Sequence, residues 1–289
     1  MEINGEQVNG TKTYAELGLS EAIMRAIEKK GYVQATPVQA GAIPYFMEWK
    51  DVIAKAPTGT GKTFAFGIPM VEHIDPECAD VQGLVLAPTR ELAVQIQEEL
   101  RDLCEFKEGV RTVCLYGGAP IDRQINTLKK KPQIVVATPG RLGDLYGQKL
   151  IDLSRLEIFV LDEADRMLDM GFIHDVRRIL GWLPAQKQTL FFSATMPPEV
   201  QGLVDSLLHN PARVAVNPIS SPVEVIDQKL YYVDRGNKTR LLAALIRELD
   251  VKNALVFTRT KHGANKVAGD LVKAGISAAA IHGNKSQTA

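Results

Sequence analysis

The loop at residues 56–63 brings small, hydroxylated and cationic side chains close together. It reads Ala-Pro-Thr-Gly-Thr-Gly-Lys-Thr, follows a short apolar run at 51–56 and precedes a helical pattern that begins near Phe64. Gly59 and Gly61 would let backbone N–H groups face an anion with no Cβ in the way. The start of the following helix would add partial positive charge at the same place.

A strand, a turn with glycines and a helix start form the arrangement that binds nucleotide triphosphates. Lys62 would supply a point charge for the β and γ phosphates, and the Thr63 hydroxyl would ligate Mg²⁺. The strict pattern begins with glycine, whereas this chain has Ala56 there. The alternative is a tight turn that binds nothing.

A second loop, at residues 162–165, is acidic and follows the apolar run 158–161. Ligands of open α/β sheets bind at the carboxyl ends of the strands. There Asp162 could hold Mg²⁺ through its waters, and Glu163 could orient and deprotonate an attacking water. An acidic loop by itself is more often only solvated. Its position downstream of the phosphate-binding pattern favours the catalytic interpretation.

Apolar runs and helical patterns alternate from residue 51 to 216. Within 90–104, for example, Leu92, Ile96 and Leu100 recur at the spacing of one helix face. Apolar strands separated by helices are typical of a parallel sheet covered on both faces. We therefore predict an α/β fold, a parallel sheet flanked by helices, with strands at 51–56, 83–87, 112–115, 133–137, 158–161, 189–192 and 213–216.

The alternation pauses at residues 217–222, where Pro and Ser predict a linker. We therefore expect a complete N-terminal domain at 1–216 and a partial second domain at 223–289. The latter has about half the residues that a complete α/β domain needs. Its predicted strands are 228–233, 254–258 and 277–281, and its predicted helices are 238–249 and 262–274.

Composition excludes several classes of protein. The chain is 45% hydrophobic and 24% charged, as in ordinary globular proteins. Its three cysteines form no C-x-x-C pair and its five histidines are scattered, so neither a zinc site nor a disulfide framework is indicated. We expect a cytoplasmic protein, because no apolar run has membrane-spanning length and the N-terminus is polar.

Residues 223–289 carry 11 basic and 6 acidic side chains, which fits a polyanion partner or an ordinary solvated surface equally well.

Residues 162–165 spell Asp-Glu-Ala-Asp, and over essentially its whole length the chain resembles DEAD-box ATP-dependent RNA helicases. The resemblance implies a RecA-like P-loop NTPase fold. Residues 31–39 resemble the family's adenine-reading motif, in which Gln39 would pair with the adenine edge and Tyr32 would stack on its face. Tyr14 stands where the family usually has Phe. The nucleotide-binding residues implied are Tyr14, Tyr32, Gln39, Thr58, Gly59, Thr60, Gly61, Lys62 and Thr63.

Further segments match family motifs in the family's order. Three of them, at 88–92, 117–118 and 138–141, resemble motifs that grip an RNA backbone, and 193–195 resembles the motif that couples nucleotide state to unwinding. Their hydroxyls, glycines and single arginines suit phosphates and sugars rather than base edges. The resemblance implies RNA contacts at Pro88, Thr89, Arg90, Gly117, Gly118, Thr138, Pro139, Gly140, Arg141 and Arg259, and catalytic roles for Lys62, Asp162, Glu163, Ser193 and Thr195.

The implied function is an RNA-dependent ATPase that locally unwinds RNA or remodels its complexes, with ATP and with Mg²⁺ at Thr63 and Asp162. Two alternatives use the same motifs: an ATP-dependent RNA clamp with little unwinding, and a DNA helicase on the same fold. Gln39, and Ala164-Asp165 in place of Ala-His, argue against the DNA helicase. The arginine-containing motifs that the family carries late in its second domain do not occur here. We therefore expect ATP binding with little RNA-stimulated hydrolysis from these 289 residues.

Overall fold

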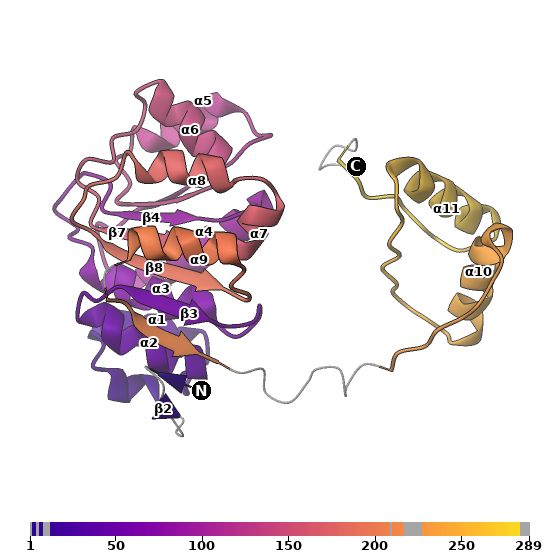
Figure 1. The fold of residues 1–289 in the computed structure, drawn as a ribbon, viewed down its shortest axis with the longest axis horizontal. Helices are drawn as coiled ribbons and strands as arrows, with labels where there is room; N and C mark the ends of the chain where they lie inside the picture. The colour runs from indigo at the N-terminus through magenta and orange to yellow at the C-terminus, as the bar shows by residue number, and fades with distance from the viewer. Residues whose placement is uncertain (1, 4–5, 8–11, 209, 217–226, 284–289) are drawn as a thin grey trace. The chain divides into compact units, whose positions relative to one another are not determined.

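The computed structural model describes residues 2–3, 6–7, 12–208, 210–216 and 227–283 (Figure 1). The chain divides into two compact units, residues 1–220 and 221–289, and each is described by itself. The linker predicted at 217–222 lies outside the described residues. The expected domain boundaries therefore stay predictions.

A nine-stranded sheet in the order β2-β1-β9-β3-β8-β7-β4-β6-β5 forms the centre of the first unit. The strands from β9 to β5 are parallel, and they match the seven predicted strands to within one residue at either end. Two short strands that were not predicted extend the sheet: β1 (Glu2–Ile3) pairs antiparallel with β9, and β2 (Glu6–Gln7) pairs antiparallel with β1. The parallel strands are β3 (Val52–Lys55), β4 (Gly83–Leu86), β5 (Thr112–Leu115), β6 (Ile134–Ala137), β7 (Ile158–Leu161), β8 (Gln188–Ser193) and β9 (Ala212–Ala215).

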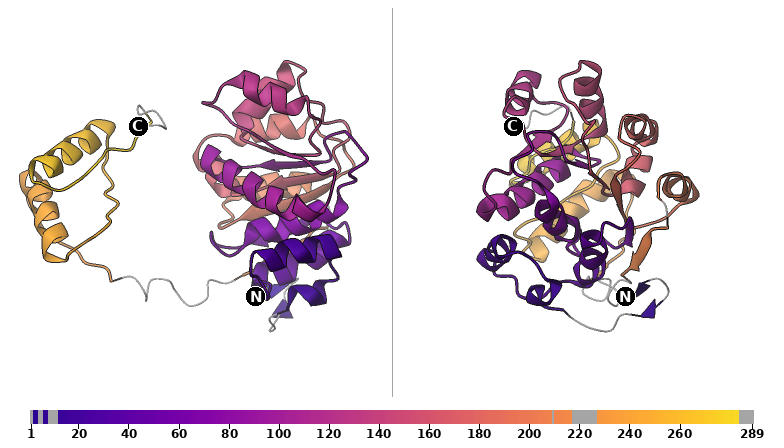
Figure 2. Two further views of the ribbon diagram at one scale, coloured as in Figure 1. Left: turned by 180° about the vertical axis from the view of Figure 1, so that it is seen from behind. Right: turned by 90° about the vertical axis from the view of Figure 1, so that its left-hand side faces the viewer.

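Helices cover both faces of this sheet (Figure 2). Successive strand residues point to opposite faces, so Val52 and Ala54 pack into one apolar cluster and Ile53 into the other. The first cluster is covered by α1 (Glu21–Lys29), α2 (Pro37–Met47), α3 (Lys62–His73) and α4 (Arg90–Leu103). The second is covered by α5 (Ile121–Leu128), α6 (Pro139–Gly147), α7 (Ala164–Asp169), α8 (Ile173–Leu180) and α9 (Pro198–Leu207). Short 3₁₀ turns lie at η1 (Tyr14–Leu17) and η2 (Cys104–Phe106).

The second unit contains η4 (Arg235–Asn237), α10 (Lys238–Glu248) and α11 (Lys261–Lys273), which confirms both predicted helices. The three predicted strands are wrong for the structure as described, because residues 227–283 contain no strand. A strand needs a hydrogen-bonded neighbour and a covered face. In this unit the apolar side chains that would face a core are exposed to solvent. Leu255 is 73% exposed and Phe257 is 88% exposed.

Phe192 on β8 packs edge-on against Phe66 of α3, with ring centroids 5.3 Å apart. We expect Phe192→Ala to lower the free energy of unfolding of the first unit by about 3–5 kcal/mol, because it leaves a cavity in a closed core. The exposed Phe257→Ala serves as control and should change it by less than about 0.5 kcal/mol. Urea denaturation followed by fluorescence tests this, since both tryptophans, Trp49 and Trp182, belong to the first unit. Equal effects of the two variants would contradict the assigned core.

Candidate nucleotide and RNA site

Strand order brings three of the predicted motifs together. The neighbouring strands β3, β8 and β7 end at the loops 56–61, 193–195 and 162–165, respectively. Because these strands are parallel, their carboxyl ends meet at one edge of the sheet, where such folds bind ligands. The Ala56 amide donates to the Ser193 carbonyl at 3.0 Å and thereby ties the first loop to the second.

The loop before α3 has the backbone that a phosphate cradle requires. Gly59 and Gly61 adopt left-handed conformations, with φ of 82° and 88°. The Thr60 hydroxyl donates to the Pro57 carbonyl at 2.8 Å and closes the turn. Lys62 then begins α3, so the loop presents its amides at a helix N-terminus.

Lys62 is 6% exposed, and its Nζ has no hydrogen-bond partner in the described part of the chain. Lys62 Nζ forms an ion pair with Asp162 Oδ1 at 3.9 Å. A buried ammonium without hydrogen bonds is costly unless another group completes its surroundings. A bound phosphate would do so, and the position of Lys62 therefore fits the nucleotide site expected from the sequence.

Asp162 is 2% exposed at the end of β7. Burial raises its pKa to about 6, although the Lys62 ammonium opposes this shift, and the Glu163 carboxylate adds to it. Its Oδ1 accepts a hydrogen bond from the Glu163 amide at 3.0 Å. A carboxyl held this way is oriented but poorly neutralised, which suits an added cation.

Glu163 has an unusual left-handed backbone, with φ and ψ both 51°, and is 7% exposed. Its two carboxylate oxygens accept hydrogen bonds from Thr58 Oγ1 at 3.3 Å and from Arg166 NH1 at 3.1 Å. The first contact joins the acidic loop to the phosphate-binding loop. Arg166 was missed in the sequence, although its position three residues after Glu163 at a helix start is a usable signal.

Ser193 and Thr195 contact the acidic loop through Asp165. The Thr195 amide and hydroxyl donate to Asp165 Oδ2 at 2.8 and 2.7 Å, and the Asp165 amide donates to Ser193 Oγ at 3.3 Å. Burial raises the pKa of Asp165, but the hydrogen bonds from Thr195, Ser193 and Arg166 outweigh it and lower this pKa overall. Both residues therefore connect β8 to β7 by holding Asp165.

Gln39 is 3% exposed in the first turn of α2, and three groups hold its amide. Its Oε1 accepts from the Tyr14 hydroxyl at 2.6 Å and the Thr36 amide at 2.8 Å, and its Nε2 donates to the Gly61 carbonyl at 3.0 Å. Among the described residues the second N–H of the amide has no partner, and its expected contact with adenine stays a prediction. Tyr14 is buried, so it reaches the site through Gln39. Thr36 belongs to the motif at 31–39 but was given no role of its own, although Thr followed by Gln three residues later is a helix-start signature.

Tyr32 is half exposed and lies edge-on to Phe64 of α3, with centroids 5.5 Å apart. Thr63, the second residue of α3, is partly exposed beside Lys62. Both side chains are therefore open at the end of α3 that carries the phosphate-binding loop. Their expected contacts with adenine and Mg²⁺ stay predictions.

The expected RNA-binding motifs follow the neighbouring strands β4, β6 and β5 at the same edge of the sheet. Thr89 caps α4 by accepting from the Leu92 amide at 3.3 Å, and the Arg90 guanidinium lies 4.6 Å from the centroid of the Tyr116 ring. This contact places the loop after β4 beside the glycines that follow β5. Pro88 is buried, whereas Gly117, Gly118 and Gly140 are exposed.

Arg141 in the first turn of α6 connects the last two of these loops. Its NH2 donates to the Ala119 carbonyl at 3.1 Å, while its Nε and NH1 are buried without a hydrogen-bond partner in the described chain. Thr138 and Pro139 form the start of α6. Arg259 is exposed in the second unit, and its expected contact with RNA stays a prediction.

The parallel sheet, the glycine-containing loop before α3 and the buried lysine beside an acidic strand end define a P-loop nucleotide-binding protein. A profile of the DEAD/DEAH box helicase family matches residues 36–203. The chain belongs to the DEAD/DEAH box helicase family, which confirms the resemblance found in the sequence.

Individual relatives agree with this assignment. The chain is 44% identical to the ATP-dependent RNA helicase CshA of Limosilactobacillus reuteri and 43% identical to the RNA helicase CrhR of Synechocystis, over 95% and 96% of its length. It spans about half the length of these relatives, 55% and 56%. A DEAD box protein from Methanococcus jannaschii has a similar structure, with a TM-score of 0.68 and 35% identity over 97% of this chain and 75% of that one.

Gly61 and Gly59 offer a matched test of the contact between the two nucleotide motifs. Both have positive φ, but a Cβ on Gly61 would lie 2.5 Å from Gln39 Nε2, whereas a Cβ on Gly59 would meet nothing within 4 Å. We expect Gly59→Ala to lower the free energy of unfolding by about 1–2 kcal/mol, and Gly61→Ala by about 2–4 kcal/mol because it also displaces Gln39. Chemical denaturation measures both. Equal losses would contradict the proposed closeness of the two motifs.

The raised pKa of Asp162 predicts a pH dependence of stability. Folding raises the pKa of the Asp162 carboxyl from 3.8 to about 6. As the pH rises from 3.8 to about 6, ionisation of this carboxyl therefore costs free energy in the folded state and lowers its stability. Asp162→Asn removes this effect. The stability of the variant relative to the parent should therefore increase by about 1–3 kcal/mol between about pH 4.5 and pH 7. Urea denaturation across this range measures it, and a pH-independent difference would show that burial does not shift Asp162.

Proposed function

We propose that this chain is the ATP-binding part of an ATP-dependent RNA helicase, which couples ATP binding and hydrolysis to RNA binding and local duplex unwinding or remodelling of RNA–protein complexes. The observation that carries this proposal is the buried, unpartnered Lys62 ammonium beside Asp162 and the glycine loop. The relatives that share its sequence are named as RNA helicases, which supports RNA rather than DNA as the partner.

In this proposal each residue of the nucleotide site has a chemical role. Lys62 and the loop amides neutralise and orient the phosphates, and Gln39 binds the base through its remaining N–H. Glu163 accepts a proton from the attacking water while Thr58 and Arg166 hold its carboxylate in place. Rate enhancement then comes mainly from positioning and charge neutralisation.

The donor set fits Mg²⁺ held chiefly by phosphate and water. The described residues contain no cluster of three or more His, Cys, Asp or Glu side chains suited to a metal. Mg²⁺ is commonly bound by one or two protein oxygens together with phosphates and water, and Asp162 and Thr63 would provide them. When bound, the ion would neutralise the charge that develops on the transferred phosphoryl group.

RNA would bind along the part of the edge formed by β4, β6 and β5. Arg90 and Arg141 would meet phosphates there, and the N-termini of α4 and α6 would add partial positive charge. Such contacts carry little sequence information. Asp165, held by Ser193 and Thr195, would transmit changes between the nucleotide and RNA loops.

A cytoplasmic location is part of the proposal, supported by the three cysteines, which are all free thiols. Within the described ranges no helix is long and apolar enough to cross a membrane.

In a longer chain that includes the family's late arginine-containing motifs, we expect Glu163→Gln to retain the affinity for an ATP analogue and to reduce phosphate release with RNA by at least about 100-fold, because an amide of nearly the same shape cannot take a proton. The measurement compares analogue binding with single-turnover phosphate release. Asp169→Asn, on the last residue of α7, is the matched control and should leave both unchanged. Hydrolysis by Glu163→Gln within about twofold of the parent would remove Glu163 from its role as the base.

A further inference from the structure

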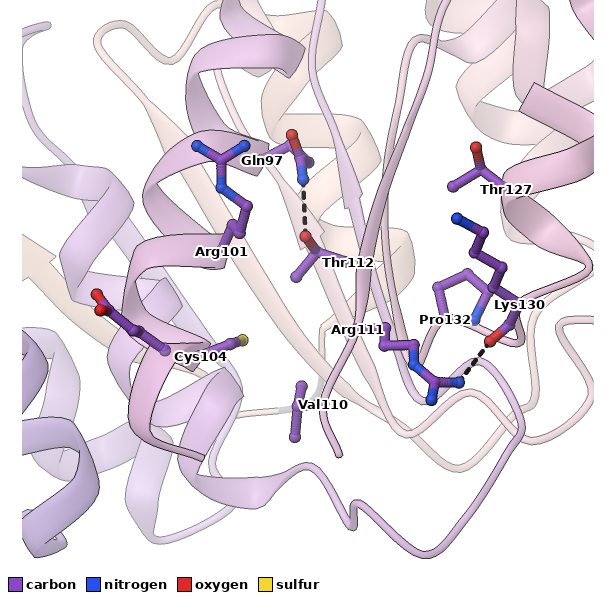
Figure 3. A pocket seen from close by; sticks show the side chains of 10 residues that line it. Gln97, Arg101, Cys104, Val110, Arg111, Thr112, Thr127, Lys130 and Pro132 are labelled. Carbon is purple, nitrogen blue, oxygen red and sulfur yellow. Dashed lines mark hydrogen bonds between the residues drawn. The ribbon is translucent and has the colours of Figure 1, made fainter. Parts of the chain in front are cut away.

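The open edge of the sheet at β5 borders a cavity of about 420 Å³ (Figure 3). Its lining includes Gln97 and Arg101 from α4, Val110 to Thr112 at the start of β5, and Lys130 just after α5. Since α4 and α5 cover opposite faces of the sheet, the cavity spans the free edge from one face to the other. It lies at the amino end of β5, whereas the nucleotide and RNA motifs follow the carboxyl ends of the strands.

The backbone of β5 leaves polar groups on this edge. The Ile134 and Thr138 amides of the β6 segment donate to the carbonyls of Arg111 and Leu115. Because neighbouring strand residues direct their N–H and C=O groups to opposite sides, Thr112 and Cys114 direct theirs away from β6. An unpaired strand edge is a template for another extended chain.

The next outward-facing residue, Tyr116, shows how such groups are satisfied within the protein. The Gln124 side chain accepts from the Tyr116 amide at 3.2 Å and donates to the Tyr116 carbonyl at 2.9 Å. It binds this residue as a paired strand would. No hydrogen bond of that kind reaches the Thr112 or Cys114 backbone from the described residues. The edge is therefore closed at its carboxyl end and open beside the cavity.

Cations surround the open part of the edge. Arg101, Arg111 and Lys130 line the cavity, and Arg111 NH1 donates to the Lys130 carbonyl at 2.8 Å, which holds that guanidinium at the rim. The acidic side chain in the lining, Glu105, already pairs with Lys29 at 2.5 Å. Arg101 lies 3.9 Å from Asp102 Oδ1, so the cations of the lining that form no ion pair within the described residues are Arg111 and Lys130.

We propose that this edge binds an acidic, extended peptide segment of a partner protein, which adds to β5 as a further strand. Amide and carbonyl groups alternate along such a peptide, so it can pair with Thr112 and Cys114, and its carboxylates can meet Arg101, Arg111 and Lys130. An RNA backbone offers phosphate acceptors and 2′-hydroxyl donors, but it lacks the paired amide and carbonyl groups at strand spacing that would match Thr112 and Cys114. The peptide leaves the ATP and RNA loops free, because they lie at the other end of the strands.

The test uses the 289-residue chain and a fluorescein-labelled peptide of eight residues with the repeat Val-Val-Glu-Glu, which presents carboxylates on both faces of an added strand. We expect saturable binding by fluorescence anisotropy and slower hydrogen exchange of the Thr112 and Cys114 amides. Arg101→Glu combined with Lys130→Glu should weaken binding by about tenfold or more through charge reversal. Lys149→Glu, an exposed lysine outside the lining, is the matched control and should bind like the parent.

Replacing the valines of the peptide by prolines removes amide donors and should abolish binding while leaving the charge unchanged. Three results would overturn the proposal. Equal binding of a Val-Lys peptide would exclude recognition by charge. Protection of the same two amides by a uridine oligonucleotide would identify a general polyanion site. Unchanged exchange at Thr112 and Cys114 would mean that the cations only guard the edge against aggregation.

Discussion

The rest of this site depends on one interaction: a buried ammonium that lies beside a carboxylate and has no hydrogen-bond partner among the described residues. Lys62 and Asp162 are almost completely shielded from water and lie 3.9 Å apart, too far to complete each other's surroundings. The free-energy cost of burying both groups is offset when a third, charged group binds to them. The order β3-β8-β7 is what places the two residues together, because one follows β3 and the other ends β7.

Two groups of loops lie at this edge of the sheet, one around Lys62 and Asp162 and one after β4, β6 and β5. Hydrogen bonds connect loops within each group. Gln39 donates to the Gly61 carbonyl, so the residues proposed to bind the base and the phosphates are joined by a hydrogen bond. Asp165 gathers Thr195 and Ser193 onto the acidic loop. The loops proposed to bind RNA follow β4, β6 and β5, and Arg141 connects two of them through the Ala119 carbonyl.

Much of the first unit could be predicted from sequence because its strands are continuous apolar runs and its helices are amphipathic. The two-residue strands β1 and β2 are too short and polar for any such pattern. The second unit shows the converse: its apolar runs exist, but without paired neighbours they form no strands in the described residues. For the site, the motifs identified the loops, whereas side-chain partners such as Arg166 and Thr36 depend on local geometry. Likewise, Tyr14 reaches the site only through Gln39, which residue type alone does not show.

The most direct test of this account is Lys62→Met, which keeps the length of the side chain and removes its charge. Two quantities are measured: affinity for a fluorescent ATP analogue with Mg²⁺, and the free energy of unfolding without nucleotide. The account predicts that affinity falls by about 100-fold or more, because charge-assisted hydrogen bonds to phosphate are lost. Stability without nucleotide should fall at neutral pH by no more than about 3–5 kcal/mol, because the buried Asp162 carboxylate loses its cation. Unchanged affinity of a variant that still unfolds in a cooperative transition would contradict a phosphate-binding role for Lys62.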